Sequence, residues 1–194
     1  MSRQELVDYL YRVADEYGID RDIAYKQIQQ ESGFNPLAKS PAGAEGIAQF
    51  TKDTGLRFGL LDRFDPIASL NAWGQYMSEL LEKFDYRYDL ALAGYNSGEY
   101  REEYSRAYNE DRGINWSVLP RRVQNETRNY VRIILGDSDR PYYASEMDSG
   151  SGNQQDISRI DSGKKSGSQD TELIILALGG LGILLFLIVG GSSR

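Results

Sequence analysis

The 194-residue sequence contains neither cysteine nor histidine. Without these residues the chain cannot form a disulfide bond, a Ser-His-Asp or Cys-His nucleophilic site, or a His/Cys zinc site. Catalytic chemistry would therefore have to come from carboxylate, lysine, tyrosine, serine or threonine side chains. The chain also lacks an excess of basic residues, since 29 acidic residues stand against 22 basic ones. This balance argues against nucleic acid as a partner.

The length suits one ordinary globular domain with additional segments, and the composition divides the chain into three parts. Residues 1–136 carry the periodic apolar patterns of a folded domain. Residues 137–171 consist mainly of Ser, Gly, Asp, Gln and Lys, with almost no large apolar side chain. Such a segment cannot bury enough apolar surface to offset its chain entropy, so we expect a flexible tether.

Long apolar runs are missing except at residues 173–191, LIILALGGLGILLFLIVGG, which carry no charge. About 20 apolar residues span the hydrocarbon core of a bilayer, so this stretch is near the minimum for a transmembrane helix. We predict that residues 172–194 form a membrane anchor, with lipid as the partner of residues 173–191.

Helical periodicity dominates residues 1–136, so the predicted fold is mainly α. Ser2 and Glu5 have the spacing of a capping box, and the charges throughout this N-terminal segment argue against a secretory signal. Asp65 before Pro66 is typical of a helix start. The predicted helices cover approximately residues 2–18, 21–31, 66–84, 89–95, 98–109 and 124–135.

Glu31 lies at the predicted end of the second helix, before a loop rich in Gly, Ala, Ser and Pro. Beside Ile28 and Phe34, a carboxyl group at this position can be partly desolvated, which raises its pKa and keeps a proton available near neutral pH. A general acid that cleaves a glycosidic bond needs this property. A glutamate at a helix end is, however, usually a solvated surface residue, so its position alone assigns no role.

Four sequence blocks, in order, resemble motifs of the soluble-type lytic transglycosylases, a family of the lysozyme-like superfamily. The blocks are residues 31–36 (ESGFNP), 40–49 (SPAGAEGIAQ), 92–98 (LAGYNSG) and 126–131 (ETRNYV). They are similar to the family's Glu-Ser motif, its Ser-x-x-Gly-Ala-x-Gly-Leu-Met-Gln and Ala-Tyr-Asn-Ala-Gly blocks, and its late Glu-Thr-Arg-x-Tyr-Val block. Ala48 and Gly94 depart from this pattern, because the family usually has Met and Ala there. The resemblance implies a lysozyme-like helical domain of the goose-type and transglycosylase kind.

The resemblance implies one catalytic residue, Glu31, acting first as acid and then as base. Five further residues are implied to bind the substrate or support the site: Ser40, Gln49, Tyr95, Asn96 and Glu126.

Each implied role has a plainer alternative. Tyr95 would hydrogen-bond or orient Glu31, or it would only pack in the core. Ser40 and Gln49 would contact the sugar, or they would be surface residues. Glu126 would be a second acid facing the cleft, or it would cap its helix or pair with Arg122 or Arg128.

Asn96 would anchor the turn after Tyr95.

The reaction implied by the resemblance is cleavage of peptidoglycan between N-acetylmuramic acid (MurNAc) and N-acetylglucosamine (GlcNAc). Glu31 would protonate the bridging oxygen, and the substrate's N-acetyl group would stabilise charge at the anomeric carbon. Glu31 would then accept a proton from the C6 hydroxyl, which closes a 1,6-anhydro ring. No cofactor or metal ion is expected. The alternatives are a goose-type-like lysozyme, in which water attacks and Glu126 or another acid serves as base, and a catalytically silent glycan-binding or structural membrane protein.

The charges near the apolar stretch bear on location. Arg159, Lys164 and Lys165 precede it and Arg194 follows it, which biases the enzyme domain toward the cytoplasmic side. Peptidoglycan lies on the other side of that membrane. One hypothesis resolves this conflict: the chain sits in the internal membrane of a membrane-containing bacteriophage, beside other virion membrane proteins, and opens the wall during genome entry. The alternative is a bacterial envelope enzyme of inverted topology.

Overall fold

The computed structural model describes residues 1–99, 101–136 and 141–143. Contacts divide the chain into two units, Met1–Gly152 and Asn153–Arg194, and all described residues belong to the first. The predicted membrane anchor lies outside the described residues. In the part of the chain that is described, no helix combines the length and apolar character needed to cross a bilayer.

The described residues form a helical domain, which confirms the predicted mainly α class. Its elements are α1 (Arg3–Glu16), α2 (Arg21–Ser32), α3 (Lys52–Arg57), α4 (Pro66–Lys83), α5 (Tyr88–Ser97), α6 (Glu102–Asn109), the 3₁₀ turn η1 (Trp116–Val118) and α7 (Arg121–Leu135). Between these helices, the only β-type pairing among the described residues consists of isolated bridges.

The helix starts follow the capping signals in the sequence. Ser2 accepts a hydrogen bond from the backbone N–H of Glu5, and the Glu5 carboxylate accepts one from the N–H of Ser2, which completes the predicted capping box. Asp20 caps α2 by accepting from the N–H of Ile23 at 2.9 Å. Asp65 caps α4 in the same way, with Pro66 as the first helical residue.

Other boundaries differ from the prediction. The helices α3 and η1 were not predicted, because they have six and three residues and are too short to show a helical period. The start of α6 falls at Glu102, since Gly98 ends α5 with a φ of 94°. The start of α7 falls at Arg121, directly after Pro120, and thus earlier than the predicted residue 124.

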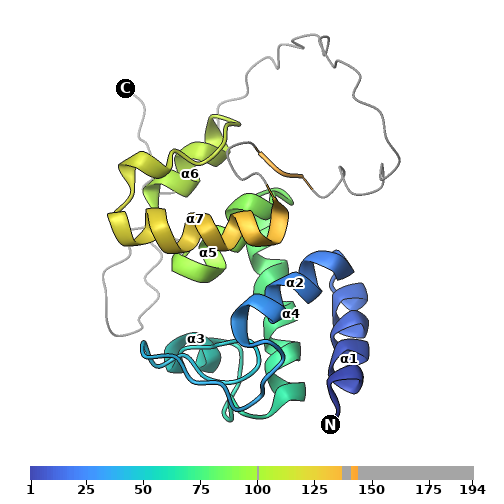
Figure 1. Cartoon of the computed structure of the whole chain (residues 1–194). Helices are drawn as coiled ribbons and strands as arrows, with labels where there is room; N and C mark the ends of the chain where they lie inside the picture. The colour runs from blue at the N-terminus through green and yellow to red at the C-terminus, as the bar shows by residue number, and fades with distance from the viewer. Residues whose placement is uncertain (100, 137–140, 144–194) are drawn as a thin grey trace, which may run out of the picture. The chain divides into compact units, whose positions relative to one another are not determined.

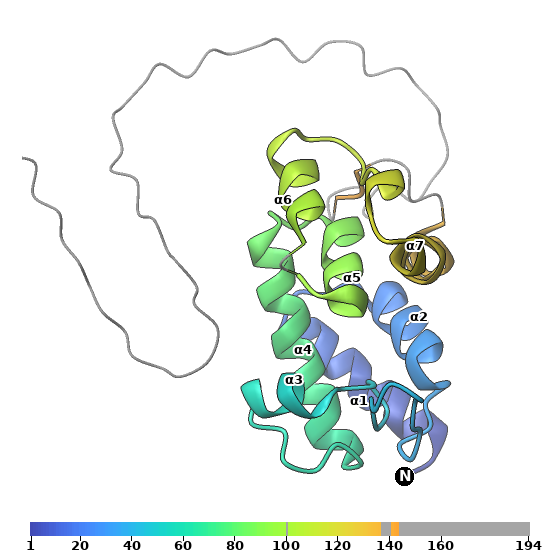
Figure 2. The same ribbon diagram turned by 90° about the vertical axis from the view of Figure 1, so that its left-hand side faces the viewer.

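The helices form a closed series of contacts. Helix α1 packs against α2 and α4, α4 packs against α5, α5 against α7, and α7 against α2. Figures 1 and 2 both show α4 running from the α1 and α3 region to the α5 and α6 region, while α2 and α7 lie next to each other. This series brings the end of α2 beside α7, although the two helices are far apart in the sequence.

Close backbone approach holds α1 against α4. A Cβ atom at Gly74 of α4 would lie 2.5 Å from Cγ1 of Val13 and 2.6 Å from Cδ2 of Tyr17. Only glycine therefore leaves room for α1 at this crossing. The core around it includes the fully buried side chains of Leu10, Trp73 and Leu80.

Residues 141–143 contact the start of α5. The backbone N–H of Tyr88 donates to the carbonyl of Tyr142 at 2.8 Å, and the N–H of Tyr142 donates to Oδ1 of Asp89 at 3.2 Å. Asp89 is fully buried and paired with Arg87, with 2.6 Å between Nη2 and Oδ2. These contacts lie beyond the predicted domain end at residue 136.

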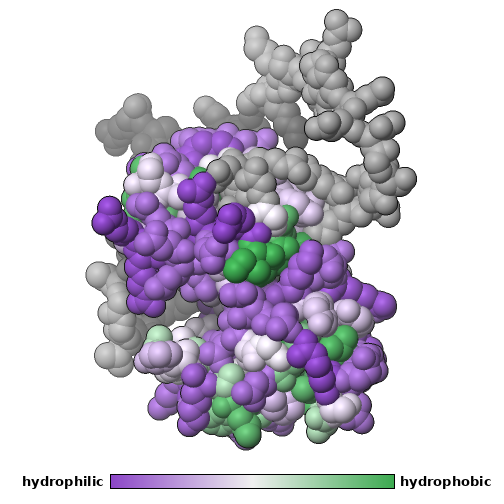
Figure 3. All heavy atoms as spheres, viewed as in Figure 1, coloured by the Kyte–Doolittle hydropathy of each residue, from purple (hydrophilic) through white to green (hydrophobic). Residues whose placement is uncertain are grey.

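The surface of the described region is mainly hydrophilic on the face shown in Figure 3, with apolar side chains in small separate groups. The large aliphatic residues exposed to solvent are Met1, Leu37, Leu56, Leu61, Val118 and Ile133. Scattered residues of this kind are ordinary on a globular domain.

Candidate active site

The end of α2 places Glu31 on a firmly held part of the backbone. Gly33 ends the helix in the left-handed conformation, with a φ of 62°. Nη1 of Arg3, from α1, donates to the Gly33 carbonyl at 2.9 Å. The hydroxyl of Ser32 donates to the carbonyl of Ile47 at 2.6 Å. Glu31 therefore lies on a helix end that is tied both to α1 and to the loop that follows.

The Glu31 carboxyl group is largely enclosed by protein, although the residue keeps some contact with solvent. Ile28 and Phe34, the two neighbours expected to desolvate it, are both buried. Burial raises the pKa of Glu31 to about 7 from an ordinary value of 4.5, and a hydrogen bond from Tyr130 opposes this rise with a smaller effect. The sequence-based expectation of a raised pKa thus agrees with the structure.

Tyr130 is the hydrogen-bond partner of Glu31. Its hydroxyl donates to Oε1 of Glu31 at 2.5 Å, across 99 positions of the sequence. Burial and then the charge of Glu31 raise the pKa of Tyr130 well above its usual range, so the hydroxyl stays a proton donor. This residue was not among the predicted site residues, although it belongs to the block at residues 126–131. Tyr130 follows Val123 and Thr127 at helical spacing on the buried face of α7, so it faces the interior of the domain.

Tyr95, which was predicted to hydrogen-bond or orient Glu31, donates its hydroxyl proton to the carbonyl of Ala48 at 2.8 Å. That proton is therefore engaged elsewhere, and the hydrogen bond on Glu31 comes from Tyr130. Burial and then the charge of Glu31 raise the pKa of Tyr95 well above its usual range. Tyr95 thus lies near enough to Glu31 to feel its charge, while it fixes the loop backbone.

Ser40 and Gln49, the two predicted sugar contacts, both form hydrogen bonds within their own loop. Oγ of Ser40 accepts from the N–H of Ala44 at 3.0 Å, and Nε2 of Gln49 donates to the Gly46 carbonyl at 2.9 Å. A Cβ atom at Gly46 would lie 1.7 Å from the Arg63 carbonyl oxygen, so the loop packs tightly there. Contact of Ser40 or Gln49 with a sugar stays a prediction.

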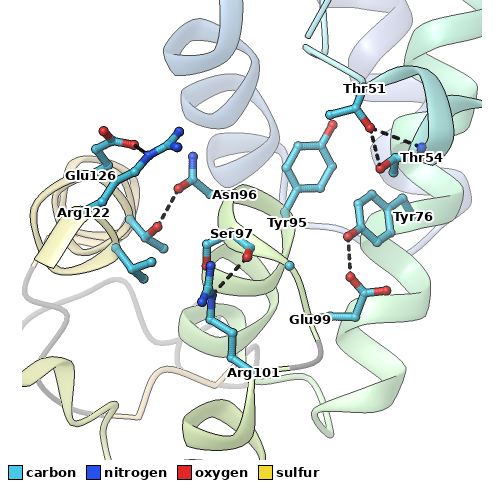
Figure 4. A pocket seen from close by; sticks show the side chains of 13 residues that line it. Thr51, Thr54, Tyr76, Tyr95, Asn96, Ser97, Glu99, Arg101, Arg122 and Glu126 are labelled. Carbon is cyan, nitrogen blue, oxygen red and sulfur yellow. Dashed lines mark hydrogen bonds and ion pairs between the residues drawn. The ribbon is translucent and has the colours of Figure 1, made fainter. Parts of the chain in front are cut away.

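A cavity of about 370 Å³ lies beside this loop, between α4, α5 and α7. Figure 4 shows Tyr95 in its wall, with Asn96 on the side that faces α7. Tyr95, Asn96 and Glu126 are the predicted site residues that line it, whereas Glu31, Ser40 and Gln49 are not among its lining residues. Tyr95 therefore connects the cavity to the surroundings of Glu31.

Asn96 and Glu126 have clear structural partners. Oδ1 of Asn96, in α5, accepts a hydrogen bond from the Thr127 hydroxyl of α7 at 2.8 Å, so Asn96 joins two helices where it was expected to anchor a turn. Glu126 is exposed on α7 and pairs with Arg122, with 2.9 Å between Oε2 and Nε. This is one of the alternative roles that the sequence left open for Glu126.

The described residues contain no group of three or more acidic side chains arranged to hold a metal ion. The site consists instead of one carboxyl group with a raised pKa, two tyrosines and a loop held by backbone hydrogen bonds. Such an arrangement can donate a proton near neutral pH and accept it again.

Residues 8–117 match the family described as Transglycosylase SLT domain. The chain belongs to this family. The match ends before α7, so Tyr130 comes from a helix outside the matched residues.

Similar proteins carry transglycosylase names. The chain is 33% identical over 148 residues to membrane-bound lytic murein transglycosylase F of Shewanella pealeana, covering 65% of this chain and 31% of the relative. It is 34% identical over 131 residues to peptidoglycan transglycosylase gp16 of Escherichia phage T7, covering 64% of this chain and 10% of the relative. The chain thus spans about a third or less of the length of these relatives.

Solved structures show the same fold. An inactive mutant of the lytic transglycosylase Slt from Pseudomonas aeruginosa superposes with a TM-score of 0.51 at 22% identity, over 71% of this chain and 26% of that one. The 70 kDa soluble lytic transglycosylase of Escherichia coli gives the same TM-score and identity over 70% of this chain and 26% of that one. The lysozyme-like fold of the described domain is thereby confirmed.

The raised pKa of Glu31 has a consequence for stability. The folded state holds the Glu31 proton more tightly than the unfolded chain does, so folded-state stability falls as the pH rises from 4.5 through about 7. Glu31→Gln removes this loss, and we expect the variant to exceed the wild type at pH 8 by up to about 3 kcal/mol. The difference should shrink toward pH 5.

Unfolding of the full chain in mild detergent at pH 5 and pH 8 measures this effect. Glu16→Gln, at an exposed position near the end of α1, is the matched control and should show no such gain. Equal effects of the two substitutions at both pH values would contradict the raised pKa.

Proposed function

We propose that the chain is a peptidoglycan lytic transglycosylase. It cleaves the β-1,4 bond between MurNAc and GlcNAc and leaves a 1,6-anhydroMurNAc end. The observation that carries this proposal is Glu31, a single carboxyl group with a pKa of about 7 in a chain of the transglycosylase family. The names of its relatives support the same activity.

The mechanism uses Glu31 twice. In its protonated form Glu31 transfers a proton to the bridging oxygen, and the bond to the MurNAc anomeric carbon breaks. The substrate's N-acetyl oxygen stabilises the positive charge that develops there. The Glu31 carboxylate then takes the proton of the C6 hydroxyl, whose oxygen bonds to the anomeric carbon. Glu31 is protonated again, and no water is consumed.

Tyr130 supports both steps. Its hydroxyl donates to Oε1 of Glu31, which favours the carboxylate form that exists between the two proton transfers. The same hydrogen bond leaves Oε2 of Glu31 as the oxygen that can exchange a proton with the substrate. Because burial raises the pKa and Tyr130 lowers it, the group titrates near neutral pH and can act as acid and base in turn.

Two alternatives fit the structure less well. A hydrolase needs a carboxylate that activates water, and Glu126, the residue considered for this role, pairs with Arg122 at the surface. A structural or purely glycan-binding protein gains nothing from burying Glu31, since desolvation of its charge costs stability. Both points favour the transglycosylase.

Product chemistry tests the proposal. The full chain is incubated with purified peptidoglycan, and the released muropeptides are weighed by mass spectrometry beside Glu31→Gln and the control Glu16→Gln. We expect products lighter by one water than lysozyme products from the wild type and the control, and a loss of at least about 1,000-fold in rate for Glu31→Gln. Reducing-end products would show a hydrolase, and no release by the wild type would contradict catalysis.

The pH profile tests the role of Tyr130. Activity requires protonated Glu31, so kcat/KM should fall as the pH rises through about 7. Tyr130→Phe removes the hydrogen bond that lowers the pKa of Glu31, so this decline should move to higher pH while the maximum rate drops.

The matched control for this variant is Tyr9→Phe. It removes a hydroxyl that donates to Asn71 between α1 and α4. It should leave the pH profile in place. If kcat/KM of Tyr130→Phe declined over the same pH range as that of the wild type, the role of Tyr130 in lowering the pKa of Glu31 would be contradicted.

We also propose that residues 173–191 anchor the enzyme in a membrane, and that it opens the wall locally during phage genome entry. Support comes from the apolar stretch, from the lysines and arginine that precede it, and from the similarity to the T7 protein. Purified virions separated into membrane and capsid fractions provide the test. The chain is expected in the membrane fraction, and its absence from virions would favour a bacterial envelope enzyme.

A further inference from the structure

Arg101 is a positive group in the cavity that the mechanism does not use. It precedes α6, lines the cavity and is half-buried. Its Nε donates to the carbonyl of Ser97 at 3.0 Å and to Oγ of Ser97 at 3.2 Å. The Ser97 hydroxyl is itself hydrogen-bonded to Tyr104 at 2.6 Å. The guanidinium group is therefore held in place from its Nε side.

Arg101 forms no ion pair with any of the described residues, and its other interaction there is with the Tyr104 hydroxyl, where its charge and a hydrogen bond oppose the rise of the Tyr104 pKa. A guanidinium group offers five N–H donors, so the two terminal nitrogens can bind a planar anion in a bidentate manner. Figure 4 shows this group in the cavity beside Ser97, between the Arg122–Glu126 pair and Glu99 in that view.

The acidic side chains of the cavity already have cationic or hydroxyl partners. Oε1 of Glu99 pairs with Nη1 of Arg57 at 2.7 Å, and Oε2 of Glu99 accepts from the Tyr76 hydroxyl at 2.8 Å. Glu126 pairs with Arg122. Arg57 is shared with Glu79, at 2.8 Å between Nη2 and Oε2, whereas Arg101 pairs with no carboxylate of the described residues, so its charge can attract an anion to this part of the cavity.

We propose that Arg101 forms a carboxylate-binding subsite for the substrate. This inference rests on the proposed function, because peptidoglycan supplies the carboxylate. Two sources share this chemistry: the stem peptide attached to MurNAc, and the lactyl group of a MurNAc without a peptide. A glycan built from GlcNAc alone has no carboxylate. The subsite therefore discriminates peptidoglycan from uncharged glycans of the same length.

Three tetrasaccharides separate the two sources of the carboxylate. The first consists of two linked GlcNAc-MurNAc units that carry stem peptides, the second is the same tetrasaccharide with free lactyl groups, and the third is a GlcNAc tetramer. Each is titrated by calorimetry into the full chain carrying Glu31→Gln, which should prevent cleavage. The three titrations are then repeated with a chain that carries Arg101→Gln in addition to Glu31→Gln. We expect roughly tenfold weaker binding of a carboxylate-bearing probe, from loss of a partly exposed charge-assisted pair, and unchanged binding of the GlcNAc tetramer.

Two further variants control for charge and for folding. Arg106→Gln removes a positive charge from α6 that is exposed and already paired with Glu102, so binding of all three probes should stay as before. Arg101→Lys keeps the charge without the planar guanidinium, and it should recover part of the lost affinity. Equal melting temperatures would show that the domain is intact in each variant.

The outcomes are distinguishable. Weaker binding of the peptide-bearing probe alone assigns the stem peptide, and weaker binding of the tetrasaccharide with free lactyl groups assigns the lactyl carboxylate. Equal losses for all three probes would make Arg101 a structural residue, and no loss for any of them would remove the subsite. If the chain with Arg101 intact binds none of the probes, the proposed function itself is contradicted.

Discussion

The hydrogen bond from Tyr130 to Glu31 is the contact on which the site depends. It joins the end of α2 to the middle of α7, so it exists only when these two helices pack together. The same packing encloses the Glu31 carboxyl group. Burial makes the charged form costly, while the Tyr130 hydroxyl stabilises it. The balance of these two effects places the pKa near neutrality, where one group can serve as both acid and base.

The loop after α2 is held by the same elements that carry the site. Ser32 binds the carbonyl of Ile47, and Tyr95 binds the carbonyl of Ala48. Two neighbouring peptide groups are thus fixed from α2 and from α5. Tyr95 also forms part of the cavity wall. Under the proposed function, a rigid loop beside the cavity would limit the freedom of a bound glycan and help to place the bridging oxygen near Glu31.

Local signals predicted much of the fold. Ser2 and Asp65 marked helix starts correctly, because a cap depends only on residues three or fewer positions away. The raised pKa of Glu31 was also foreseen from its neighbours Ile28 and Phe34. Helices without a strong local signal, such as α3, were missed.

The partner of Glu31 could not be read from local pattern. Tyr130 lies 99 positions away, and only the packing of α2 on α7 shows that its hydroxyl reaches Glu31. The period of α7 could have turned attention to Tyr130, since it faces inward while Glu126 is exposed. The resemblance to family motifs pointed to Glu126 and Tyr95, because a motif identifies residues by their position in the sequence and not by the contacts that they make.

The most direct test of this account is the titration of the Glu31 carboxyl group itself. The ¹³C chemical shift of its carboxyl carbon, assigned by comparison with Glu31→Gln, is followed by NMR from pH 3 to pH 9. We expect a midpoint at about 7. A midpoint near the ordinary value of 4.5 would mean that Glu31 is ionised at neutral pH, and the proposed acid step would then lack its proton.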